Sequence, residues 1–179
     1  KQHYPNIIQN NTVDGHLVGL PYAGDFGILY FRKDLLDKYG FKTPPKTWPE
    51  LQDQATKIMM GEKASNPNFT GFVFQGKAYE GLTCDALEWF QSSGAGGFID
   101  DGKPTIAGDK GIQVMTLFQK FVGTISPKDV TSYGEEEARN IFQSGNAAFM
   151  RNWPYAYALA SDKTSPIVGK FDVAPLPAA

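Results

Sequence analysis

The sequence predicts an α/β domain, in which helices flank a layered sheet of mixed strand directions. Short β-rich runs alternate along the chain with helical patterns of about 10–15 residues, which is typical of α/β layers rather than of a β-sandwich or a helical bundle. At 179 residues the chain can fill one hydrophobic core. We therefore expect a single domain over residues 1–179.

Composition argues against several classes of protein. The chain is 41% hydrophobic and 20% charged, with a formal net charge of -2. It has no basic excess of the kind that nucleic-acid binding favours, and no run approaches the roughly 20 apolar residues that cross a bilayer. No signal peptide begins the sequence, so we expect the chain to start within a longer protein or after processing.

Metal and cofactor chemistry is not expected. His3 and His16 have no cysteine or carboxylate at metal-ligand spacing. Cys84 is the only cysteine, and we predict a small buried side chain without a disulfide partner. The glycine-rich stretch 94–97 follows a helical pattern, whereas a dinucleotide loop opens one; no P-loop or other catalytic motif is present.

Local signals define the elements of the first third. They predict strands over residues 16–22 and 26–32 and helices over 33–39 and 48–63. Gly40 provides a C-cap for the first helix. Thr47 and Glu50 match a capping box at the start of the second, and Pro49 occupies an early position where proline is tolerated.

The middle third combines one strand with two helices. The pattern predicts a strand over 70–75, helices over 80–93 and 112–122, and between them a loop with an extended piece at 104–107. Apolar residues at helical spacing predict which face is buried. In the helix over 112–122 the inward set is Ile112, Met115, Phe118 and Val122.

The last third is expected to contain a helix over 135–143, a strand over 147–151, a helical turn over 154–160 and a strand over 171–174. Ala138, Ile141 and Phe142 are the predicted buried face of that helix. The run 135–137, three glutamates, is predicted to be a solvated acidic first turn.

Three short segments place aromatic and polar side chains at the ends of predicted strands, at 22–25, 79–82 and 151–155. In open α/β sheets, ligands bind in the crevice beyond strand ends. A sugar offers an apolar face that packs on rings and a rim of hydroxyls that need donors and acceptors. The candidate ligand-binding residues are Asp25, Trp153, Tyr155, Tyr22, Glu80, Tyr79 and Asn152.

Plainer interpretations of these residues stay open. Trp153 and Tyr155 are equally compatible with core aromatics. Asp25 could accept backbone hydrogen bonds within its own turn, and Glu80 at a helix start is favourable to the helix dipole without any ligand.

A family resemblance adds to this pattern. The segments 13–22 (VDGHLVGLPY), 29–36 (LYFRKDLL) and 44–51 (PPKTWPEL) resemble the family 1 extracellular solute-binding proteins, the sugar receptors of ABC importers related to maltose-binding protein. The segments 75–82 (QGKAYEGL), 87–89 (LEW) and 152–155 (NWPY) resemble the trehalose/maltose-binding branch more narrowly. The resemblance spans nearly the whole chain.

The resemblance implies one lobe of a periplasmic-binding-protein-like II fold. Two α/β lobes of such a receptor close over the ligand about strands that cross between them. Residues 16–21 resemble the strand that enters the second lobe and 171–175 the strand that leaves it, so this chain resembles the second lobe only. Asp25 then resembles a hydroxyl-binding acid and Trp153 a stacking platform.

The implied function is non-catalytic binding of a maltose- or trehalose-type α-disaccharide. Implied partners are the sugar, the first lobe of the receptor and the membrane subunits of an ABC importer, with self-association of the fragment as a further hypothesis. The implied location is periplasmic or otherwise extracytoplasmic, with a lipid anchor on the full-length protein as an open alternative.

Other functions remain compatible with the residues. Asp25 and Glu80 could be the paired carboxylates of a glycoside hydrolase fragment, which stand ~5–9.5 Å apart. The chain is also compatible with an isolated folding unit that has no activity. A receptor for peptides or iron fits less well, because the sequence shows neither an arginine cluster nor a Tyr/His iron set.

Overall fold

The computed structural model describes residues 3–179 and is built around a four-stranded sheet with the strand order β4-β7-β3-β8. β3 pairs antiparallel with both β7 and β8, whereas β4 pairs parallel with β7. This mixed sheet confirms the predicted α/β class. Its strands are β3 (Ile28–Arg32), β4 (Thr70–Val73), β7 (Ala147–Asn152) and β8 (Phe171–Ala174).

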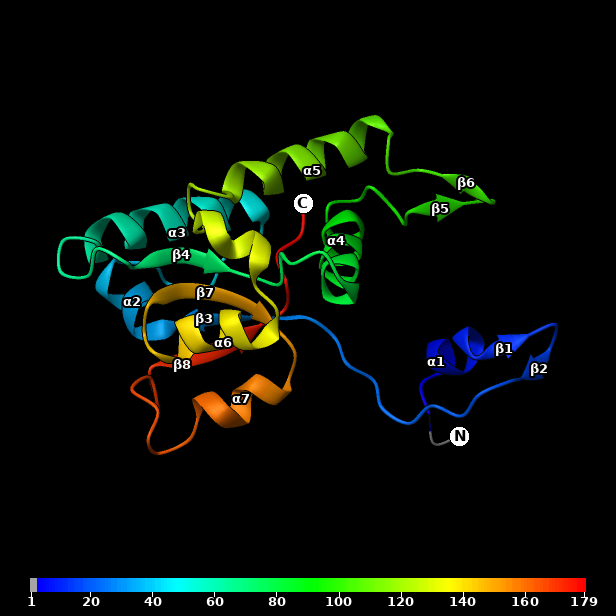
Figure 1. The fold of residues 1–179 in the computed structure, drawn as a ribbon, viewed down its shortest axis with the longest axis horizontal. Helices are drawn as coiled ribbons and strands as arrows, with labels where there is room; N and C mark the ends of the chain where they lie inside the picture. Colours follow the sequence, from blue (N-terminus) through cyan, green and yellow to red (C-terminus); the bar gives the residue numbers. More distant parts are fainter. Residues whose placement is uncertain (1–2) are drawn as a thin grey trace.

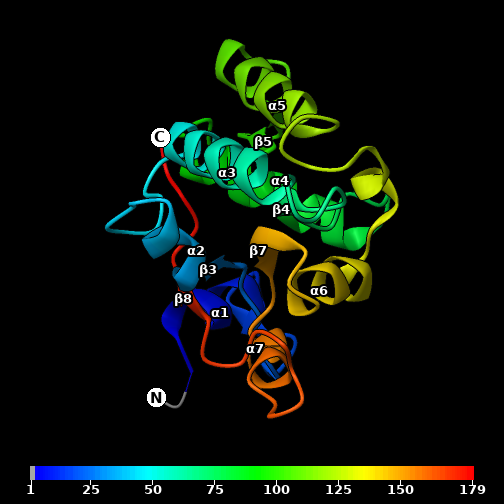
Figure 2. The ribbon, with the colours of Figure 1, turned by 90° about the vertical axis from the view of Figure 1, so that its left-hand side faces the viewer.

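Helices cover both faces of this sheet. α3 and α5 lie on one side and α6 and α7 on the other (Figure 2), and both α3 and α6 contact β4 and β7. Every residue of β7 is consequently buried. The helices are α2 (Lys33–Lys38), α3 (Trp48–Glu62), α4 (Glu80–Ser92), α5 (Asp109–Phe121), α6 (Glu135–Gln143) and α7 (Tyr155–Ala160), with a 3-10 turn, η1, at Lys128–Ser132.

The predicted start of α3 is confirmed in detail. The backbone N–H of Glu50 donates to the Thr47 hydroxyl at 3.2 Å, and the Glu50 carboxylate accepts from the Thr47 N–H at 3.3 Å. This reciprocal capping box satisfies two of the N–H groups that a helix start leaves unpaired. In α6, Ala138 and Phe142 are fully buried as predicted, while Ile141 is only partly buried.

The predicted buried face of α5 is confirmed only in part. Ile112 and Met115 are 54% and 47% exposed, whereas Val114, Phe118 and Phe121 are buried. Two apolar stripes run along this helix, and spacing alone could not choose between them. Phe118 belongs to both stripes and is buried as predicted, stacked on Trp89 with 3.6 Å between ring centroids, and Val122 is partly buried.

The predicted extended piece at 104–107 is also corrected. The structure instead has a small hairpin of β5 (Ile99–Asp100) and β6 (Lys103–Pro104). Asp101 and Gly102 turn the chain with φ of 46° and 70°. Two successive positive φ values suit the tight turn of a two-residue hairpin, which Asp-Gly favours.

The predicted strand over 16–22 is largely absent. Only β2 (His16–Leu17) is a strand, and it pairs with β1 (Thr12–Val13) rather than with the main sheet. Asp14 and Gly15 close this hairpin with positive φ. Beyond it, residues 18–27 have no regular structure, because Gly19, Pro21 and Gly24 interrupt any strand ladder.

The N-terminal unit, formed by α1 (Pro5–Asn10), β1 and β2, stands apart from the body of the protein. Figure 1 shows it joined to β3 by an extended stretch of chain. None of residues 3–26 is buried. We call residues 18–27 the connecting segment below.

A candidate binding edge of the sheet

The topology brings the three predicted segments to one edge of the sheet. Ile28 at the start of β3 lies opposite Asn152 at the end of β7, and Val73 at the end of β4 is level with Met150. The arrowheads of β4 and β7 therefore point to the side where the chain enters β3 (Figure 1). The segments that meet the sheet at this edge are 18–27, 74–79 and 153–154.

Trp153 is held in one orientation at this edge. Its indole Nε1 donates to Glu135 Oε1 at 3.0 Å, and its carbonyl accepts from the buried Tyr30 hydroxyl at 2.7 Å. The guanidinium carbon of Arg151 lies 3.7 Å from the centroid of the indole ring. At this distance the buried Arg151 side chain covers one face of the indole, while Trp153 as a whole is half-buried.

Arg151 belongs to a buried network of charges. Its Nε donates to Glu88 Oε2 at 2.8 Å, its Nη1 lies 2.9 Å from Gln75 Oε1 and 2.8 Å from Asp85 Oδ1, and its Nη2 bonds the second Glu88 oxygen. The network thus sets two carboxylates against one guanidinium. Burial raises the pKa of Asp85 well above its usual value; the Arg151 charge opposes this rise, and the Glu88 charge adds to it.

The connecting segment joins this network at Gly27. The Gly27 N–H donates to Glu88 Oε1 at 3.1 Å. A Cβ at this position would lie 2.4 Å from Glu88 Oε2 and 2.5 Å from Arg151 Nε, so only glycine allows the approach.

Tyr155 lies on the first turn of α7 and is 39% exposed. Its hydroxyl donates to Glu136 Oε1 at 2.6 Å. The pKa of Glu136 is lowered by hydrogen bonds, first from Arg139 and then from Tyr155. Burial and this carboxylate raise the pKa of Tyr155 above its usual range. Tyr155 therefore stays a neutral hydrogen-bond donor with part of its ring in solvent.

Tyr79 and Glu80 stand where α4 begins, and Tyr79 is the N-cap residue. The Tyr79 side chain is half-buried, and burial followed by the nearby Glu135 carboxylate raises its pKa. Glu80 is exposed, and its carboxylate accepts from the Cys84 thiol at 2.9 Å. Cys84 was predicted to be buried but is only partly so; burial and the Glu80 carboxylate raise its pKa to about 11.

Asp25 and Tyr22 are both fully on the surface of the connecting segment. With His3, Tyr4 and Ile7 near the N-terminus they line a hollow of about 320 Å³. Trp153 and Tyr155 do not line this hollow. The structure therefore brings Asp25 and Trp153 to the same edge of the sheet without placing them in one cavity.

Asn152 needs a correction. Its side chain has no exposed surface, and its amide donates to the Glu135 carbonyl at 3.1 Å and accepts from the Trp153 N–H at 2.8 Å. A side chain buried in this way supports the edge and cannot contact a ligand directly. The acidic run at 135–137 forms the first turn of α6 as predicted, with Glu136 and Glu137 exposed, but Glu135 is half-buried, and Glu135 and Glu136 also accept hydrogen bonds from Trp153 and Tyr155.

Sequence reasoning missed the residues beneath the platform. A signal for Arg151 existed, since an arginine inside the otherwise apolar run of β7 requires a buried partner. A signal for its partners was weaker. Asp85 and Glu88 are one turn apart on α4 beside Trp89, but an acidic pair on a helix is more often solvated.

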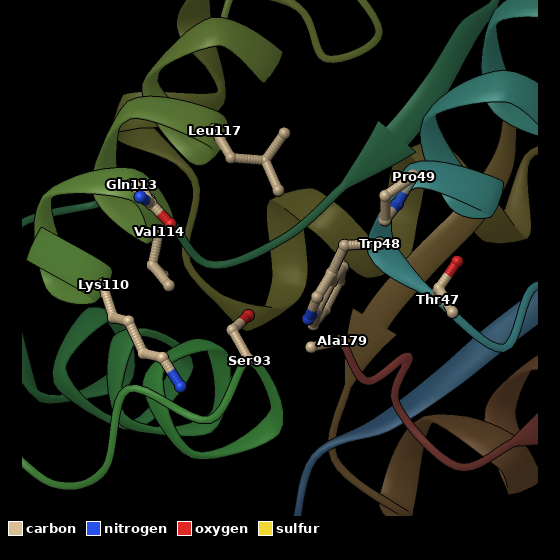
Figure 3. A pocket seen from close by; sticks show the side chains of 9 residues that line it. All are labelled: Thr47, Trp48, Pro49, Ser93, Lys110, Gln113, Val114, Leu117 and Ala179. Atoms are coloured by element: carbon tan, nitrogen blue, oxygen red, sulfur yellow. The ribbon is translucent and has the colours of Figure 1, made fainter.

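Another hollow lies away from this edge. It has a volume of about 410 Å³ and is enclosed by the start of α3, the end of α4, α5 and Ala179 (Figure 3). Its lining is mainly apolar, with Trp48, Val114 and Leu117 facing one another across it. None of the candidate ligand-binding residues lines this hollow.

Among residues 3–179, no group of three His, Cys, Asp or Glu side chains is arranged to hold a metal ion. In that same range the structure has no helix of the length and apolar character that would cross a bilayer.

The chain belongs to the bacterial extracellular solute-binding protein family, whose model matches residues 3–179. The family consists of binding proteins rather than enzymes. A probable ABC transporter-binding protein of Deinococcus radiodurans is 58% identical over 99% of this chain and 43% of its own length.

Solved structures agree with this assignment. The maltose-bound MalE3 of T. maritima matches with a TM-score of 0.89 and 44% identity, over 98% of this chain and 44% of its own. A ribitol complex of a solute-binding protein from Agrobacterium radiobacter K84 matches with a TM-score of 0.84 and 27% identity, over 98% of this chain and 43% of its own. The chain thus spans less than half the length of these relatives.

Proposed function

We propose that this chain forms the second lobe of a receptor that captures a maltose- or trehalose-type disaccharide for an ABC importer. The observation that carries the proposal is the Trp153 indole, half-buried at the sheet edge and held in orientation by Glu135 and Arg151. A fixed ring packs on the apolar face of a pyranose at little cost in side-chain entropy. Of the two solved structures named above, the one with the higher TM-score is the maltose-bound MalE3.

The rim of the proposed site would come from residues of the same edge. Tyr155 and Glu80 offer a hydroxyl and a carboxylate group near the platform, and Tyr22 and Asp25 offer the same groups from the connecting segment. These groups can exchange hydrogen bonds with sugar hydroxyls. Asn152 is left out because its side chain is buried, and Tyr79 because its hydroxyl oxygen is buried.

The proposed mechanism is hinge closure. The lobe would be bounded by chain crossings near 16–21 and 171–175, and sugar held between two lobes would stabilise the closed receptor. The importer's membrane subunits would then recognise the closed form. Capture of the sugar and recognition by the importer would take place outside the cytoplasm.

The test is calorimetry on the full-length gene product with maltose, trehalose, mannitol and ribitol. The two disaccharides should bind, and Trp153→Ala should weaken binding at least tenfold because the stacking face is lost. Phe74→Leu, a change in a buried residue at the same edge, is the control for altered packing. Tight binding of a polyol alone would reject the disaccharide assignment, and no binding of any of the four compounds would reject the function.

A further inference from the structure

The charged network beneath Trp153 has a role beyond holding the fold together. We propose that Arg151 is a positioning residue for the Trp153 platform, and that Glu88 couples this platform to the connecting segment that carries Asp25. The inference rests on the proposed sugar-binding function and assigns the parts of the site that set its geometry.

Stability alone gives little reason for this network. Arg151 occupies a fully buried position in β7 between apolar residues. A buried ion pair is often no more stabilising than well-packed apolar residues of the same volume, because the charges must be stripped of water. An arginine kept at such a position is therefore better explained by the geometry that it imposes.

That geometry is fixed at every nitrogen of the guanidinium. Nε and Nη2 bind the two oxygens of Glu88 as a fork, while Nη1 is held by Asp85 and Gln75. The plane of the group cannot rotate without breaking several of these contacts. With its carbon 3.7 Å from the indole centroid, the guanidinium is a rigid support for one face of Trp153. A lysine ammonium would keep the charge but would supply neither the fork nor the flat face.

Glu88 extends the support to the connecting segment. Its Oε1, which bonds Arg151, also accepts the Gly27 N–H at 3.1 Å. Gly27 lies two residues after Asp25 in the chain. A displacement of Glu88 is thereby transmitted both to the stacking platform and to the start of β3.

The first experiment needs no sugar. The chain has three tryptophans, and Trp48 and Trp89 are buried at 1% and 2% exposure. Each of the three indole N–H groups gives one signal in a nitrogen–proton correlation spectrum. The signal that is missing from the spectrum of Trp153→Phe is that of Trp153. Arg151→Lys should shift or broaden the Trp153 signal and leave the other two in place. Arg32→Lys is the matched control, since Arg32 is another largely buried arginine with a carboxylate partner, at the opposite end of β3.

The second experiment is a double-mutant cycle on the full-length gene product, with the sugar affinity as readout. Arg151→Lys should weaken maltose binding on the order of tenfold. A change of this size is within the range of interaction energies found between residues of one network. In a Trp153→Ala background the same substitution should have no further effect. A purely structural role for Arg151 would weaken binding equally in both backgrounds, and that result would overturn the proposal.

Glu88→Gln keeps the proposal testable if Arg151→Lys does not fold, because it leaves Arg151 paired with Asp85. It should move the Trp153 signal and the amide signal of Gly27 together. An unmoved Trp153 signal in the folded variants would also reject the proposal. If the unaltered protein binds no sugar, the proposed function fails, while the spectra still decide whether Arg151 positions Trp153.

Discussion

At the scale of single residues, Gly27 is where the exposed connecting segment meets the buried charges. It has the tightest environment of the glycines in that segment, because its missing side chain leaves room for Glu88 and Arg151. Gly24, three residues earlier, would place a Cβ at an ordinary 3.5 Å from Ile7. The two glycines thus make a matched pair for a stability measurement.

Gly27→Ala should lower the free energy of unfolding by about 1–3 kcal/mol, because overpacking forces buried groups to move. Gly24→Ala should change it by less than about 1 kcal/mol, in the stabilising direction, since alanine reduces the entropy of the unfolded chain. Urea unfolding of both variants checks the pair. Equal effects of the two substitutions would contradict the close packing at Gly27.

Glu135 predicts a pH dependence. Partial burial is the largest single influence and opposes its ionisation, but the hydrogen bonds to its carboxylate, first among them that from Trp153, together with the Arg151 charge outweigh burial, so its pKa is lowered from the ordinary 4.5. A carboxyl whose folded pKa is depressed stabilises the protein above the unfolded pKa, and that contribution is lost as pH falls through the folded value.

Glu135→Gln should therefore cost about 1 kcal/mol at pH 7, a charged hydrogen bond discounted for partial exposure. The difference from the unaltered protein should shrink below about pH 4, where Glu135 itself becomes protonated. Thermal unfolding of both proteins between pH 3 and pH 7 measures this, with Asp53→Asn as the control at an exposed carboxylate. A difference that is constant over that range would show that the charge of Glu135 is irrelevant.

The residues that stand at the candidate edge could be predicted from the sequence, but the contacts that hold them could not. Trp153 and Asp25 follow or precede strands, and this local signal placed them correctly at the sheet edge. Arg151 and Glu88 are 63 residues apart in the chain. Their pairing depends on how α4 packs against the end of β7, which neither residue's neighbours in the sequence specify.

At the scale of elements, the starts of helices are the best predicted features, because they depend on residues within one turn. Thr47 and Glu50 fix the beginning of α3 wherever the helix packs. The buried face of α5 was predicted only in part for the opposite reason, since it depends on contacts with other elements, such as that of Phe121 with Phe72 of β4. The strand over 16–22 failed because alternating apolar residues predict a strand only where a partner is available.

Thr47→Ala should lower the free energy of unfolding by about 1 kcal/mol, through loss of the α3 cap. Thr56→Ala is the control within the same helix. The Thr56 hydroxyl donates to the Gln52 carbonyl, a mid-helix contact that is neutral or slightly destabilising. Alanine also has a higher helix propensity than threonine. Chemical denaturation should order the proteins with Thr47→Ala as the least stable. The reverse order would contradict the importance of the capping box.

At the scale of the whole molecule, the candidate edge is open on one side. A ligand pocket usually encloses 70–90% of its ligand's surface, but here Trp153 is only half-buried, and Asp25 and Tyr22 are exposed and share no cavity with it. The relatives above are more than twice as long as the matched region. A sugar on this edge alone would make only part of the contacts that a two-lobed receptor offers.

The 179-residue chain should therefore bind a disaccharide weakly or not at all. A micromolar site corresponds to about 8 kcal/mol of binding free energy, and half of that leaves an affinity of about 1 mM. Calorimetry with maltose and trehalose on this chain, beside the full-length gene product, measures the difference. Micromolar or tighter affinity in the chain alone would mean that the edge is a complete site, and that closure by a second lobe contributes little to capture.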